Sequence, residues 1–198
     1  AWSSDLATQT GGRRYEWLSD GTRLVLNTAT AVDVRFDQQL RRIVLLHGEI
    51  RVETGRDPQG RPLEVWTRDG RLRPVGTRFT VRSDPGAWWQ TAPTEVRVEA
   101  GAVDVLAADL DPMQPVRVAA GQRLSFRKDR VDARQTADTA DSAWADGQFV
   151  AERMRLDEVV AELSRYRRGV LRCDPAVADL RVTGTWPLDA EVGGRVAG

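Results

Sequence analysis

The sequence predicts a mostly β protein with one small α+β unit near its C-terminus. Between residues 13 and 134, short apolar runs recur at roughly 8–12-residue spacing with glycine between them, which is typical of an all-β sandwich, jelly roll or solenoid-like domain. No strict repeat period separates a solenoid from the other two architectures. The one convincing helical periodicity lies at 156–166, inside a unit expected over 144–198.

The strands of the β domain are predicted from alternation. Val32, Val34 and Phe36 are separated by charged residues, so this run is expected to bury one face. The run 43–46 (Ile-Val-Leu-Leu) is apolar on both faces and predicts a central strand.

Two stretches lack apolar periodicity. Residues 1–12 are polar and are expected to form a tether. Residues 135–143 contain no large apolar side chain and are expected to form a linker. The predicted order is therefore a tether (1–12), an all-β domain (13–134), a linker (135–143) and the C-terminal unit (144–198).

The predicted helix has one apolar stripe. Five side chains fall at i, i+3, i+4, i+7 and i+10, namely Leu156, Val159, Val160, Leu163 and Tyr166. Acidic residues in the first turn and arginines in the last suit the helix macrodipole, and Gly169 stands where a left-handed C-terminal cap is expected. Strand-like runs at 148–150, 170–173 and 180–186 flank this helix, so the unit is predicted to be strand–helix–strand–strand.

Composition excludes several classes of protein. The 29 basic and 29 acidic residues cancel, so no basic field for nucleic acid is expected. Cys173 is the sole cysteine, which excludes an intrachain disulfide and a cysteine metal cluster, and it is expected to be a small buried side chain in a strand. No run approaches the ~18 apolar residues of a membrane span.

No set of residues predicts catalysis, a metal site or a cofactor. His47 is the only histidine, so a nucleophilic triad or a histidine metal site has no support, and a structural or exposed histidine is expected. Most carboxylates alternate with apolar residues as on a solvated sheet face, namely Asp33, Glu64, Glu95, Glu99 and Asp104. A hydrolase with two facing carboxylates stays open as an alternative.

Trp88 and Trp89 form the most unusual local feature, in a loop over 83–93 that carries proline and glycine. The two adjacent tryptophans are explained if one ring packs back on the sheet. Alternatively, both could form a secondary aromatic contact for a partner or a sugar. The second possibility predicts a different function, that of a periplasmic glycan-binding β domain.

The chain also resembles the periplasmic region of FecR-type transmembrane sigma-factor regulators, which are anti-sigma factors. The resemblance covers residues 5–189 and rests on the order and spacing of many short motifs. These are Asp5–Thr8, Gly12-Arg13, Leu18–Thr22, Leu26–Thr28, Arg42–Glu49, Arg61-Pro62, Val75–Phe79, Glu99–Val103, Ala119–Gln122, Ala143-Trp144, Gly147–Phe149, Leu156–Leu163, Arg165-Tyr166, Asp174-Pro175 and Val182–Gly184.

The resemblance implies a periplasmic, non-enzymatic, signal-receiving region of a single-pass inner-membrane protein. Its implied partner is the signalling domain of a TonB-dependent outer-membrane transporter, usually one that imports an iron chelate. An extracytoplasmic-function sigma factor would be bound by a cytoplasmic segment that is absent from this sequence. The C-terminal unit resembles the STN fold, which would continue beyond Gly198, so the unit is expected to be truncated.

Docking is expected on residues 147–186, either by strand addition to an exposed sheet edge or on the outer face of the helix. Candidate partner-binding residues are Phe149, Glu158, Glu162, Arg165, Val182 and Trp186. Of these, Glu158, Glu162 and Arg165 are expected at the surface, whereas Phe149 is expected to act mainly through folding.

Overall fold

The β domain is one continuous sheet of twelve strands. In the computed structural model, which describes residues 4–84 and 92–188, the sheet path is β1-β4-β5-β6-β7-β8-β10-β11, with β2, β3, β9 and β12 paired at its sides. The strands are β1 (Leu6–Ala7), β2 (Arg14–Trp17), β3 (Arg23–Leu26), β4 (Ala31–Phe36), β5 (Arg41–Glu53), β6 (Leu63–Thr67), β7 (Gly70–Ser83), β8 (Thr94–Ala107), β9 (Val116–Ala119), β10 (Gln122–Arg127), β11 (Arg130–Val131) and β12 (Gln135–Thr136).

Long strands that change partners along their length let this sheet close around a core. The first part of β5 pairs with β4 and, in parallel, with β6, and its second part pairs with β3 and β7. Gly48 lies between the two parts with a φ of 97°, where a left-handed residue accommodates the irregular register. The enclosed core is aliphatic and aromatic, and includes Leu24, Ile43, Ile50, Phe79 and Phe126.

The predicted mostly β class with a small additional unit is confirmed. Two expectations about the stretches around the β domain are wrong. Residues 6–12 are not a tether, because β1 pairs with β4 and the Thr8 amide donates to the Thr30 carbonyl at 2.9 Å, just before β4. Residues 135–143 are not a plain linker, because β12 pairs with β10 and a 3₁₀ helix, η1 (Thr139–Asp146), follows at once.

The C-terminal unit contains η1, β13 (Gln148–Arg155), α1 (Leu156–Ser164), η2 (Pro175–Val177) and β14 (Arg181–Pro187). β13 and β14 form a two-stranded antiparallel sheet with a bulge between Ala151 and Met154, where Arg153 has a φ of 52°. The predicted strand at 170–173 is wrong, since this stretch has no strand pairing, and Cys173 is partly exposed and not in a strand.

Helix α1 begins at Leu156, as the periodicity predicts. It ends at Ser164, before Tyr166 and well before the predicted cap at Gly169, because Arg165 and Tyr166 are held against the β domain. Val159 packs on Phe149 and Ala151, with Leu163 and Val182 at the edge of this small core. Within the described ranges no helix has the length and apolar character needed to cross a membrane.

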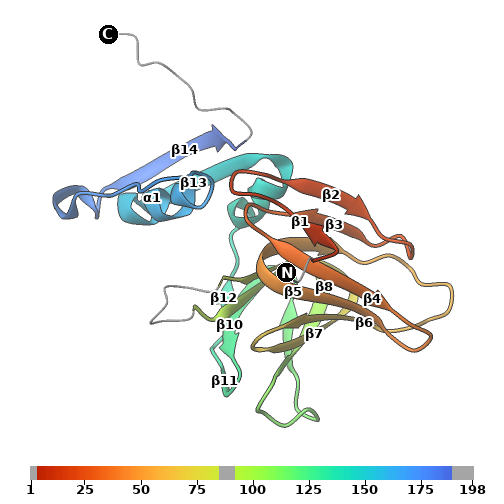
Figure 1. Cartoon of the computed structure of the whole chain (residues 1–198). Coiled ribbons are helices and arrows are strands. Elements are labelled where there is room, and N and C mark those ends of the chain that lie inside the picture. Colours follow the sequence, from red (N-terminus) through yellow and green to blue (C-terminus); the bar gives the residue numbers. More distant parts are fainter. Residues whose placement is uncertain (1–3, 85–91, 189–198) are drawn as a thin grey trace.

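The C-terminal unit lies at one end of the β domain, beside the β2–β3 hairpin (Figure 1). Trp144 and Ala145 of η1 pack on Val25 of β3, and the Tyr15 hydroxyl of β2 donates to the Ala145 carbonyl at 2.9 Å. The two units are therefore joined by apolar contacts at η1 as well as by the chain itself.

Candidate functional site

Charged side chains meet where the C-terminal unit contacts the β domain. The Glu49 carboxylate on β5 is buried and pairs with Arg165, at the end of α1, with 2.9 Å between Nη1 and Oε2. Arg97 on β8 lies on its other side, 3.5 Å from Oε1. Arg82 on β7 pairs with Glu162 of α1 at 3.0 Å. These five residues are called the junction cluster.

The β domain holds Glu49 in place through local hydrogen bonds. The Glu49 amide donates to the Thr30 hydroxyl at 3.0 Å, and the Asn27 side-chain amide donates to Glu49 Oε2 at 2.9 Å. The same Asn27 amide donates to the Tyr166 hydroxyl at 2.8 Å. Gly48 permits this close packing, because a Cβ there would lie 2.3 Å from the Thr30 hydroxyl oxygen. The buried Glu49 carboxylate and the Asn27 amide are thus both hydrogen-bonded, as burial requires.

The arginines keep the buried carboxyl ionised. Burial by itself raises the pKa of Glu49, but the charges of Arg165, Arg82 and Arg97 outweigh it and hold the pKa below the ordinary 4.5. Burial also raises the pKa of Tyr166 strongly, and its phenol therefore stays protonated. A general acid for glycoside hydrolysis needs a raised carboxyl pKa, and Glu49 has the opposite shift.

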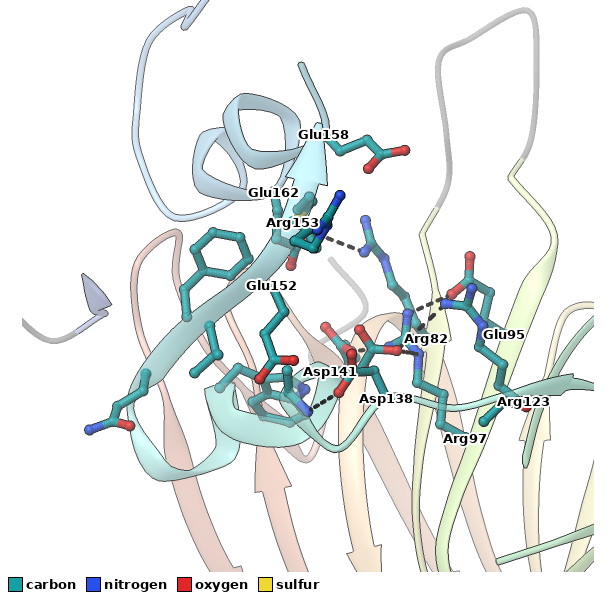
Figure 2. Close-up of a pocket in the computed structure, with 18 of the residues that line it drawn as sticks. Arg82, Glu95, Arg97, Arg123, Asp138, Asp141, Glu152, Arg153, Glu158 and Glu162 are labelled. Atoms are coloured by element: carbon teal, nitrogen blue, oxygen red, sulfur yellow. Dashed lines mark hydrogen bonds and ion pairs between the residues drawn. The ribbon is translucent and has the colours of Figure 1, made fainter. Parts of the chain in front are cut away.

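Next to the junction cluster lies an open cleft of about 650 Å³ between the two units. β8 and β10 line one side with Glu95, Arg97 and Arg123, and β13 lines the other with Glu152 and Arg153 (Figure 2). Asp141 of η1 bridges Arg97 and Arg123 at 3.3 and 3.5 Å. The walls are therefore charged with both signs, and ion pairs across them tie the units together.

The described residues offer no site for a metal ion, since no three histidine, cysteine or carboxylate groups come together there. His47 is exposed, and its Nδ1 lies 2.9 Å from the Ala29 carbonyl. Glu64, expected on a solvated face, is instead buried, with hydrogen bonds from Arg73 and Trp66 at 2.7 Å. Its ion pair makes Glu64 a structural carboxylate.

Three of the predicted partner-binding residues form the small core of the C-terminal unit. Phe149 and Trp186 stack with their ring centroids 5.5 Å apart, and Val182 packs beside them. These side chains face α1, and the outward residues of β14 are Arg181, Thr183 and Thr185. They are positioned to support the fold of the unit.

The three charged candidates lie in two different environments. Arg165 and Glu162, expected at the surface, belong to the junction cluster, with 13% and 25% of their side chains exposed. Glu158 is exposed as expected, and its carboxylate accepts from the Arg155 amide at the helix N-terminus at 3.3 Å. Trp88 and Trp89 lie outside the described residues. The sequence reasoning missed Glu49, Asn27 and Tyr166 as members of one buried contact, although all three stand in motifs of the family resemblance.

A second feature missed at the sequence level is an exposed apolar stretch between α1 and β14. Val170, Leu171, Val177 and Leu180 are all exposed, Val170 by 80% and Leu180 by 58%. Of the ten large apolar side chains exposed among the described residues, these four fall within eleven positions. We call residues 170–180 the exposed segment. Single exposed apolar residues are ordinary, but such a concentration makes this segment a candidate interaction surface.

The family model described as FecR protein matches residues 4–104. No curated protein matches the chain. Two crystal structures of a candidate anti-sigma factor from Parabacteroides distasonis ATCC 8503, at 1.65 Å and 2.50 Å resolution, have TM-scores of 0.71 and 0.70. Each is 22% identical, and the alignments cover 94% and 93% of this chain and 85% and 84% of the other. At this identity the likeness shows a shared fold.

Proposed function

The chain belongs to the FecR family, whose model matches just over half of it, and from this premise we propose that it is the signal-receiving region of a transmembrane regulator of a sigma factor. In this proposal the region is periplasmic, and its partner is the signalling domain of a TonB-dependent outer-membrane transporter. A cytoplasmic segment of the same protein would bind an extracytoplasmic-function sigma factor. The similarity in fold to a candidate anti-sigma factor supports this regulatory role.

The observation that carries the proposal is the exposed segment on the C-terminal unit. It is the chain that leads from the end of α1 back to the start of β14, where the Leu180 carbonyl accepts from the Leu156 amide (Figure 1). Apart from the exposed Glu158, the predicted contact residues are engaged within the protein, since Trp186 packs on Phe149 and Arg165 pairs with Glu49. The exposed segment is therefore the part of this unit that is free to contact another protein through apolar side chains.

Charge around the exposed segment defines the kind of surface that would fit it. Four exposed arginines border or interrupt it, namely Arg167, Arg168, Arg172 and Arg181. Its two carboxylates are used locally, because Asp174 accepts from the Ala176 amide and Asp179 pairs with Arg155. We therefore expect the signalling domain to present an apolar patch with an acidic rim, since opposite charges favour encounter and register.

A calorimetric titration of the chain with signalling domains from transporters of the same organism tests this function. We expect one domain to bind, and a Val170→Ser/Leu180→Ser variant to bind it at least about tenfold more weakly, because buried apolar anchors dominate protein interfaces. Met113→Ser, which alters an 84% exposed residue on the β domain, is the matched control and should leave affinity unchanged. Absence of binding by every such domain to the wild-type chain would rule the proposal out.

A further inference from the structure

The turn Asn27–Thr30, between β3 and β4, contacts two segments that are far apart in the sequence. One is residues 8–12, which follow the N-terminal strand β1. The other is Arg165-Tyr166, which ends the helix of the C-terminal unit. The turn lies between them, and its Asn27, Thr28 and Thr30 are each at most 2% exposed, whereas Ala29 is exposed.

On the N-terminal side the contacts are made by backbone groups and by the hydroxyls of Thr8 and Thr28. Thr8 donates its hydroxyl to the Asn27 carbonyl at 2.5 Å and accepts from the Thr30 amide at 3.0 Å. The Ala29 amide donates to the Gln9 carbonyl at 3.1 Å, at a position where Ala29 has a φ of 46°. These bonds fix the path of residues 8–12 to the shape of the turn.

On the C-terminal side the turn holds the residues at the end of the helix. Asn27 donates to the Tyr166 hydroxyl, as described above, and the Thr28 hydroxyl donates to the Arg165 carbonyl at 3.0 Å. Arg165 also pairs with Glu49, whose carbonyl accepts from the Asn27 amide at 2.9 Å. The position of the helix end is therefore set by the same turn.

The Thr28 hydroxyl joins the two sides directly. Its oxygen accepts from the Gly11 amide at 2.8 Å while its hydrogen is donated to the Arg165 carbonyl. A hydroxyl has one donor and two acceptor sites, so both bonds form at once. Gly11 also passes close to the helix end, because a Cβ at this residue would lie 2.9 Å from the Tyr166 carbonyl oxygen.

We propose that the Asn27–Thr30 turn couples the C-terminal unit to residues 8–12, so that displacing Arg165 and Tyr166 loosens the N-terminal segment. Since the turn has hydrogen bonds to both sides, loss of one side lowers the stability of the other, and the coupling is reciprocal. We call this coupling through the turn the relay. Its functional meaning rests on the proposed function, in which the chain before residue 4 leads towards the membrane. Binding at the C-terminal unit would then be transmitted to the membrane-proximal end of the region.

Amide hydrogen exchange of the isolated chain, read by NMR, tests the relay without any partner. Thr28→Val removes the hydroxyl and nearly keeps the shape, whereas Thr28→Ser keeps the hydroxyl. We expect exchange at Gly11, Gly12 and Tyr166 to accelerate at least about fivefold in Thr28→Val and to stay near the wild-type rate in Thr28→Ser. Equal rates in the two variants would overturn the role of the hydroxyl.

The stronger test changes a residue on the C-terminal side of the turn and measures amide exchange on the N-terminal side. Arg165→Met should accelerate exchange at Thr8, Gly11 and Gly12, although the ion pairs of the Arg165 side chain are with other residues, namely Glu49, Asp84 and Glu162. Arg168→Met, an exposed arginine three residues later, is the control and should leave these amides unchanged. The milder Tyr166→Phe, which removes one hydroxyl, applies the same test should Arg165→Met fail to fold.

Because the coupling is reciprocal, the reverse experiment decides whether the relay exists. Thr8→Val removes two hydrogen bonds to the turn and should accelerate exchange at the helix end, at Arg165 and Tyr166. Unchanged exchange on the far side in both directions, with folded variants, would overturn the relay. That result would leave partner binding untouched, because it concerns only the communication within the chain.

Discussion

Arg165 and Glu49 are 116 residues apart in the sequence, yet their side chains form an ion pair at 2.9 Å between the C-terminal unit and the β domain. Glu49 has only 2% of its side chain exposed, and Arg165 has 13%. A buried carboxylate of this kind is costly unless it is paired, so the position of the C-terminal unit is tied to the stability of the β domain.

Removing Arg165 should therefore cost more than a surface arginine does. Arg165→Met is expected to lower the free energy of unfolding by about 3 kcal/mol, because Glu49 stays buried and loses its 2.9 Å ion-pair partner, keeping only Arg97 at 3.5 Å and the charge of Arg82. Arg168→Met should change it by less than about 0.5 kcal/mol. Urea unfolding measures both, and the double variant Glu49→Gln/Arg165→Met should recover part of the loss, since no unpaired charge remains. Strictly additive losses would contradict this coupling.

The lowered pKa of Glu49 predicts a pH dependence. Because the pKa is lower in the folded than in the unfolded state, the stabilisation is complete above the ordinary 4.5 and is lost as pH falls through the folded value. The difference in unfolding free energy between wild type and Glu49→Gln should therefore shrink below about pH 4.5. Using the difference cancels the contributions of other carboxyls. A difference that is constant from pH 7 to pH 3 would contradict the assignment.

Gly48 should be the least replaceable of the left-handed glycines near the site. Gly48→Ala is expected to cost about 3 kcal/mol, because strain at a φ of 97° is joined by a Cβ 2.3 Å from the Thr30 hydroxyl oxygen. Gly121→Ala is the matched control, with a φ of 77° and no atom within 4 Å of the added Cβ. It should cost only about 1 kcal/mol in the same unfolding experiment. Equal losses would mean that packing against Thr30 does not matter.

Trp186 should matter through the fold of the C-terminal unit. Trp186→Ala removes the stack on Phe149 and is expected to destabilise the β13–β14 sheet by about 2 kcal/mol, since the ring is only partly buried. Trp186→Phe keeps an aromatic ring and should lose less. Amide exchange in β13 reports the local loss, while exchange in β7 and β8 should remain unchanged.

Much of the β domain could be predicted from the sequence, because one-sided burial leaves a period of two, as at Val96 and Val98 in β8. Residues 6–7 and 135–136 could not. Their strands are two residues long and bind by backbone pairing, which leaves no side-chain pattern.

The site was harder to predict for a different reason. Arg165 and Glu162 stand on the polar side of an amphipathic helix, where a charged residue is usually solvated. They are partly buried because the helix contacts a second unit, and periodicity within one element does not report a contact between units. The exposed segment gave the opposite error, since Val170 and Leu171 suggested a strand but form no strand pairing and are 80% and 39% exposed.

Hydrogen exchange of the wild-type chain with and without its cognate signalling domain tests the central claim most directly. The account predicts slower exchange at 167–181, where the exposed segment lies, together with altered exchange at residues 8–12, on the far side of the Asn27–Thr30 turn. Protection confined to the β domain, with residues 167–181 and 8–12 unchanged, would contradict it.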